Sequence, residues 1–155
     1  MTQATTKDEE ASLVQTHLAQ IEQKLKEKEV KSHHLADALV RAMACHTLGY
    51  DVTFMRLKAL ELAQKGNVLE KKMGYLACVM LLEPSDELIL LLVNTVIKDL
   101  RSKNVMEVNL ALNAAIYLTP KEMTPMILPI IMEKSTHKNV RQKTRLSWNS
   151  EKYFF

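Results

Sequence analysis

The sequence predicts an all-α protein, an α-solenoid of antiparallel helix pairs of the HEAT or armadillo kind. The composition is rich in helix-forming residues and includes only three glycines in 155 residues, which favours helices over strands. Helix-start signals recur near residues 67, 85, 104 and 119, at intervals of 18, 19 and 15 residues. Two such helices with their turns take roughly 35 residues, within the range of helical-repeat units. Short connections between them make neighbouring helices antiparallel.

The first helix is expected over residues 8–29, where Thr6 and Glu9 form a capping-box pattern. Its apolar residues make one narrow stripe, and charged residues cover the rest of its surface. The stripe consists of Leu13, Val14, Leu18, Ile21 and Leu25. This pattern is typical of a terminal helix that packs on one side only. A membrane-surface helix is the alternative, but its charges would be mainly basic, and here they are mixed.

The next three helices are expected over residues 33–47, 53–64 and 68–82. The last of these starts with Asn67 and Glu70 in capping-box positions. Gly74 lies inside it, where glycine costs about 1 kcal/mol relative to alanine. We therefore expect a neighbouring helix to approach closely at this glycine.

Helices follow over residues 86–101, 105–117 and 124–134. The first of them is apolar around nearly its whole circumference, which predicts an inner helix with neighbours on several sides. Asn104 and Glu107 form another capping-box pattern before the second. Pro120 suits a first helical turn, and Pro129 predicts a kink after a restart near Thr124.

Composition excludes several classes of function. A formal net charge of +3 is too small to indicate nucleic-acid binding. The longest apolar run, Leu88 to Val93, is far shorter than the ~20 residues that span a bilayer. Any membrane association is therefore expected to be peripheral or through partners. Cys45 and Cys78 lie in apolar helical surroundings, which favours small buried hydrophobic residues in a reducing compartment over a disulfide framework.

No catalytic or metal-binding motif emerges from the sequence. The five histidines lack zinc-site spacing, and there is no glycine-rich phosphate loop or nucleophile elbow. Lys71, Lys72 and Lys98 are interpreted as solvated helix charges. The carboxylates of Asp86 and Glu87 are explained by the dipole at a helix start. We expect neither an enzyme nor a cofactor.

Four segments, in this order, carry a family resemblance. They are Leu48–Phe54, Ala63–Asn67, Glu70–Leu76 and Leu90–Leu100. Together they resemble the N-terminal trunk of adaptin large subunits, and most closely the epsilon subunits of the fourth adaptor-protein complex. The resemblance covers about residues 9–143. It implies a disordered segment at 1–7, a helical-repeat domain at 8–143 and an off-pattern tail at 144–155.

The resemblance also implies partners and a location. Such subunits assemble with a second large, a medium and a small adaptor chain in vesicle-mediated protein transport. An Arf-family GTPase recruits the complex from the cytoplasm to trans-Golgi or endosomal membranes. The positions that match a GTPase-binding face in gamma-type relatives are Leu57, Leu60 and Leu91.

The chain departs from the family pattern in three places. Near the N-terminus only Lys7 is available for the basic residue of the family's dileucine-cargo pocket. Ala36-Asp37-Ala38 stands where alpha subunits have a phosphoinositide-binding Lys-Lys-Tyr, so lipid binding through that patch is not expected. After Lys143 the family continues into an apolar helix, and this chain does not.

The departure after Lys143 predicts a truncated product. A solenoid cut within a repeat leaves an uncovered apolar end, so we expect marginal stability or self-association of the isolated chain. The alternative to an adaptor subunit is a generic helical-repeat scaffold outside trafficking, and co-purifying partners would distinguish the two.

Overall fold

The computed structural model describes residues 7–26, 30–83 and 85–135. This part of the chain contains seven α-helices, two short 3-10 helices and no strand. The α-helices are α1 (Lys7–Leu25), α2 (Ser32–Thr47), α3 (Arg56–Lys65), α4 (Val68–Leu81), α5 (Leu88–Leu100), α6 (Val105–Leu118) and α7 (Thr124–Ser135). The 3-10 helices are η1 (Thr53–Met55) and η2 (Lys121–Met123). The predicted all-α solenoid is confirmed.

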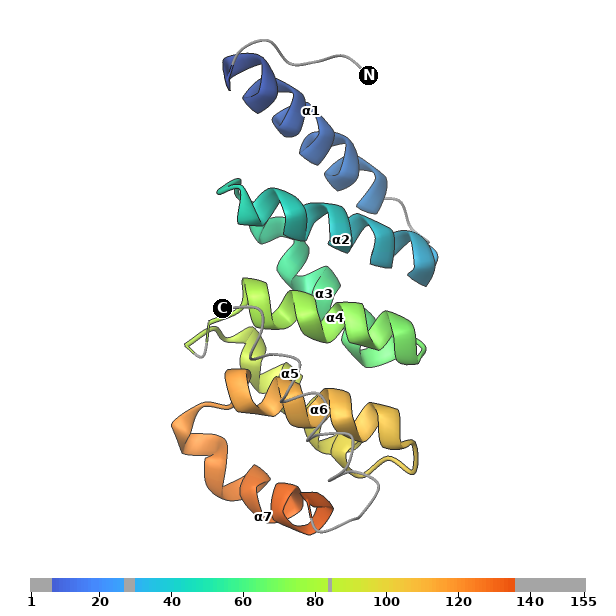
Figure 1. Ribbon diagram of the computed structural model, residues 1–155, viewed down its shortest axis with the longest axis vertical. Helices are drawn as coiled ribbons and strands as arrows, with labels where there is room; N and C mark the ends of the chain where they lie inside the picture. Colours follow the sequence, from blue (N-terminus) through green and yellow to red (C-terminus); the bar gives the residue numbers. More distant parts are fainter. Residues whose placement is uncertain (1–6, 27–29, 84, 136–155) are drawn as a thin grey trace.

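The helices form two stacked layers (Figure 1). One layer contains α2, α4 and α6, which contact one another in that order. The other contains α3, α5 and α7, which also contact one another in order. The hairpin pairs α3–α4 and α5–α6 join the layers. α1 lies at one end of the stack beside α2, and α7 lies at the other end.

Helix bounds agree with the sequence prediction to within two residues except in two places. The first helix was predicted to reach residue 29, but α1 ends at Leu25. Thr53–Met55 forms the 3-10 helix η1, so α3 begins only at Arg56. At the N-terminus, Lys7 was assigned to the disordered segment but begins α1, because the acidic residues that follow suit a first helical turn. Residues 1–6 and 136–155 lie outside the described part, and with them Thr6 and the predicted tail. α7 begins at Thr124 as expected, and the kink at Pro129 stays a prediction.

Of the two capping boxes within the described residues, one is complete and one is not. The Asn67 side chain accepts hydrogen bonds from the backbone of Leu69 and Glu70, and the Glu70 carboxylate accepts one from Asn67 N at 2.8 Å. Asn104 accepts from Met106 N at 3.0 Å. The prediction that Glu107 completes this capping box is wrong. Its carboxylate instead accepts hydrogen bonds from Lys71 Nζ at 3.0 Å and from the Ser102 hydroxyl.

Gly74 lies where α4 meets α3 at close range. A Cβ at this position would lie 2.5 Å from the backbone nitrogen of Ala63 and 3.0 Å from the carbonyl oxygen of Ala59. Only glycine allows two backbones this near each other. The close approach predicted from the sequence is therefore confirmed.

The core runs between the two layers along the whole stack. In α1 the residues Leu18, Ile21 and Leu25 are buried against it, while Leu13 is exposed. α5 contacts α3, α6 and α7, as expected for an inner helix. One strip of it nevertheless faces solvent, and that strip belongs to the candidate site.

Candidate partner-binding face

α3 and α5 begin side by side, and one carboxylate holds their starts together. Arg56 Nη1, at the first residue of α3, donates to Asp86 Oδ2 at 3.1 Å. Asp86 Oδ1 accepts a hydrogen bond from Leu88 N, the first residue of α5, at 3.1 Å. Asp86 therefore binds the first residue of α5 and the first residue of α3 at the same time. The first turns of both helices lie at the same end of this layer.

Those first turns carry large apolar side chains that are open to solvent. Leu57 in α3 is 59% exposed and Leu91 in α5 is 50% exposed. Leu90, beside Leu91, is 54% exposed. We call Leu57, Leu90 and Leu91 the leucine face. Three half-exposed leucines on two adjoining helix starts are the kind of surface that partner proteins cover.

Leu60 does not belong to this face. It is only 2% exposed and shares the buried side of α3 with Ala59 and Ala63. A partner cannot touch it in this conformation. Leu90, by contrast, was not singled out from the sequence, because the resemblance assigned the contact only to Leu57, Leu60 and Leu91.

At the other end of α5, in its last turn, a buried ion network joins three helices. Lys71 Nζ of α4 donates to Asp99 Oδ1 of α5 at 2.8 Å and to Glu107 Oε1 of α6 at 3.0 Å. The hydroxyl of Tyr75 donates to Asp99 Oδ2 at 2.8 Å. The side chains of Lys71 and Asp99 are 8% and 2% exposed. The prediction of a solvated Lys71 is therefore wrong, since two carboxylates distant in sequence enclose it.

Burial and contacts within the network shift the pKa of Lys71, Glu107 and Tyr75. Burial alone lowers the pKa of Lys71, but hydrogen bonds and charges from Asp99 and Glu107 outweigh it, so the pKa is raised. Hydrogen bonds from Ser102 and then Lys71 lower the pKa of Glu107. Burial, followed by the charge of Asp99, raises the pKa of Tyr75, so its phenol stays protonated and donates. The network links α4, α5 and α6 through side chains that lie far apart in the sequence.

The described residues offer little other chemistry. Among them no three His, Cys, Asp or Glu side chains gather closely enough to hold a metal ion. No helix formed by these residues is both long and apolar enough to cross a membrane. Cys78 is buried, and burial raises the pKa of its thiol to about 12, while Cys45 is half-buried. The Cys78 thiol is therefore a poor nucleophile at neutral pH.

The opposite layer has an apolar surface of its own. Each of its helices exposes at least one large apolar side chain. Examples are Val40 in α2, Leu76 in α4, and Ile116 and Tyr117 in α6, which are 45–53% exposed. A stack with exposed apolar residues on both layers is suited to more than one protein contact.

Comparison with known proteins gives a consistent family. The family described as "Adaptin N terminal region" matches residues 10–147. The chain is 42% identical over 149 residues to the AP-4 complex subunit epsilon-1 of Homo sapiens and 40% identical to that of Mus musculus. Each match covers 95% of this chain. It is 34% identical to the AP-4 complex subunit epsilon of Arabidopsis thaliana over 91% of its length. The chain spans only 13–15% of the length of these relatives.

Proposed function

We propose, because this chain belongs to the adaptin N-terminal family, that it serves as part of the trunk of an adaptor-complex large subunit in vesicle-mediated protein transport. Its role is that of a scaffold and not of a catalyst. The observation that carries this proposal is 42% identity to a human AP-4 epsilon subunit across 95% of the chain. The two-layered stack of helices supports it, since such stacks bind through extended surfaces.

The leucine face is proposed as the docking surface for an Arf-family GTPase. Leu57 and Leu91 occupy the positions that the resemblance assigns to this contact, and both are exposed. Their helices begin side by side through Arg56 and Asp86, so one partner could cover both first turns. Leu90 joins them, and Leu60 is left out of the proposed contact because it is buried. GTP-dependent binding at this face would bring the chain to trans-Golgi or endosomal membranes as a peripheral protein.

The other layer is proposed to contact the remaining adaptor chains. Leu76 and Ile116 lie on neighbouring helices of that layer and are about half exposed. An apolar interface with a small, medium or second large chain would cover them. The two layers would then serve two kinds of partner, one permanent and one regulated by nucleotide.

Co-purification tests the proposal of adaptor membership. The chain is co-expressed with the second large, medium and small chains of an AP-4 complex, and each is tagged in turn. The expected result is recovery of this chain with at least one of them. If the chain and a longer form that includes the family's following helices both fail to recover any adaptor chain, the adaptor proposal is wrong. The surviving explanation would then be a helical-repeat scaffold outside trafficking.

A nucleotide-dependent pull-down tests the GTPase contact. An Arf-type GTPase loaded with a non-hydrolysable GTP analogue is expected to retain the chain, and the GDP form is not. Leu57→Glu with Leu91→Glu should weaken retention about tenfold or more, because central apolar anchors dominate such interfaces. Leu69→Glu is the matched control, since Leu69 is 75% exposed in the first turn of α4. Equal weakening by the control would remove the leucine face from the proposed contact.

A further inference from the structure

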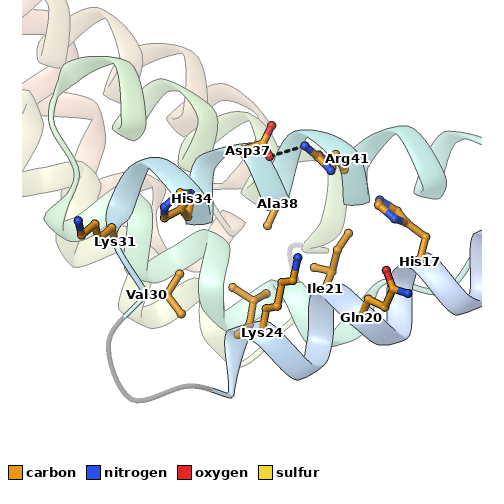
Figure 2. A pocket seen from close by; sticks show the side chains of 11 residues that line it. His17, Gln20, Ile21, Lys24, Val30, Lys31, His34, Asp37, Ala38 and Arg41 are labelled. Carbon is orange, nitrogen blue, oxygen red and sulfur yellow. Dashed lines mark ion pairs between the residues drawn. The ribbon is translucent and has the colours of Figure 1, made fainter.

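A groove of about 490 Å³ lies between α1 and α2 at the end of the stack. Figure 2 shows it from close by, with α1 on one side and α2 on the other. It differs from the leucine face in its place and its lining. Neither the family comparisons nor the proposed contacts assign it a role.

Positive charge dominates the polar side chains that line the groove within the described residues. Lys24 extends from α1 toward α2, and Lys31 and Arg41 flank it on the α2 side. His17 and His34 add two imidazoles. These groups are spread along the groove and do not converge on one point (Figure 2).

Among the described residues that line the groove there is one carboxylate, and it does not cancel this charge. Asp37 pairs with Arg41 through a 2.8 Å contact between two residues one helical turn apart. Both side chains are more than half exposed, at 61% and 53%, so the pair is weak and readily exchanged. An incoming anion can share Arg41, and Lys24 and Lys31 remain to attract it.

Between the charges the lining is apolar. Ile21 and Leu25 of α1 form one side, and Val30 and Ala38 lie across from them. Ile21 and Leu25 are almost wholly buried, whereas Val30 and Ala38 are partly open. The groove therefore offers an apolar floor beneath separated cations.

We propose that this groove binds a short acidic peptide segment that inserts one apolar side chain between its carboxylates. Separated cations match several carboxylates spaced along an extended chain, and the floor between Ile21 and Ala38 matches the apolar side chain. A single phosphate headgroup would use one or two of the cations and leave that floor uncovered. The shape and charge of the groove thus favour a peptide over a membrane surface.

Fluorescence anisotropy with the full chain tests this inference. The probe is a labelled peptide in which two glutamates precede and two follow a single leucine. Binding is expected at low salt and should weaken as salt rises. Replacing the leucine by serine, or the glutamates by glutamines, should each reduce the affinity. Lys24→Glu with Lys31→Glu should reduce it about tenfold, because two attractive charges become repulsive.

Two further variants separate groove binding from general attraction. Lys72→Glu with Lys103→Glu makes the same charge change at exposed lysines outside the groove and should leave the affinity within about twofold. Ala38→Phe fills the groove without changing charge and should weaken binding as strongly as the Lys24 and Lys31 pair. Circular dichroism of each variant confirms that the helices are retained.

The results that would overturn the inference are distinct. Equal loss in the Lys72 and Lys103 control would mean that net charge alone attracts the peptide. Absence of peptide binding together with groove-dependent binding to phosphatidylserine vesicles would assign the groove to membranes. Absence of binding to either probe would leave the groove without this role. Because no adaptor chain or GTPase enters the assay, its failure is separate from failure of the adaptor proposal.

Discussion

Replacing Lys71 by methionine should destabilise the protein strongly, because it removes the only cation of a buried network. The Lys71 side chain is 8% exposed and that of Asp99 is 2% exposed. In Lys71→Met the methionine side chain fills the volume of the lysine's aliphatic part, but the ammonium group is lost. The Asp99 carboxyl group then remains in the core with only the Tyr75 hydroxyl beside it.

The size of the effect follows from this asymmetry. Breaking a buried ion pair by removing one partner costs about 3–5 kcal/mol. The Tyr75 hydroxyl still donates to Asp99, and Glu107 is 21% exposed and can be solvated, so we expect about 3 kcal/mol. Asp99→Asn should cost less, about 1–2 kcal/mol, because Lys71 retains Glu107 and the amide oxygen still accepts. The central expectation is that Lys71→Met lowers the free energy of unfolding more than Asp99→Asn does.

Urea unfolding followed by far-UV circular dichroism measures these free energies. Thermal melting gives a second reading, in which 3 kcal/mol corresponds to a fall in Tm of about 10 °C for a domain of this size. Lys72→Met is the matched control, since Lys72 is the exposed neighbour on the same helix. Its free energy of unfolding should stay within about 0.5 kcal/mol of the parent.

The reasoning fails if Lys71→Met and Lys72→Met unfold at the same urea concentration. It also fails if Asp99→Asn is more destabilising than Lys71→Met, because the second carboxylate would then contribute nothing to Lys71. A double-variant cycle between positions 71 and 99 should give a coupling free energy of about 1 kcal/mol or more.

Three further expectations follow from the structure. Gly74→Ala should destabilise by about 1–3 kcal/mol in urea unfolding, despite the better helix propensity of alanine, because its Cβ would meet the Ala63 backbone; a neutral result would refute the close approach. Asn67→Ala should cost about 1 kcal/mol through loss of both cap hydrogen bonds, and an unchanged melting curve would refute that role. Stability measured against pH should fall at both extremes. The raised pKa of Lys71 gives stability that is present below its unfolded value of about 10.4 and is lost as pH rises through the folded value. The lowered pKa of Glu107 gives stability present above about 4.3 and lost as pH falls through the folded value. A profile that is unchanged in Lys71→Met would contradict the alkaline part.

Local sequence signals were sufficient to predict the position of most of the helices. The cap at Asn67 and the glycine at position 74 were predicted correctly, because each acts through neighbours on its own helix or through the absence of a side chain. The cap at Asn104 was predicted only in part. The Glu107 carboxylate could accept a hydrogen bond from a local backbone nitrogen or from the ammonium of Lys71. It binds the ammonium, because a hydrogen bond to a charged donor is the stronger one.

The candidate sites show the limit of sequence reasoning most clearly. Leu57 and Leu60 are both leucines of one helix, yet one is 59% exposed and the other 2%. Lys71 and Lys72 are adjacent and identical in type, yet only Lys71 is enclosed. Which side of a helix is buried depends on neighbours that lie far away in the sequence, such as Asp99 and Glu107 at separations of 28 and 36 residues.

The sequence by itself determined the all-α class, the order of the helices, their approximate ends and the adaptin family. These properties depend on periodicity, caps and motif order, which are written in contiguous residues. Only the tertiary structure decided which leucines face a partner, which lysine is buried, and that α1 and α2 leave a basic groove between them. Those features arise where separate helices meet, and the packing of one layer against the other fixes them.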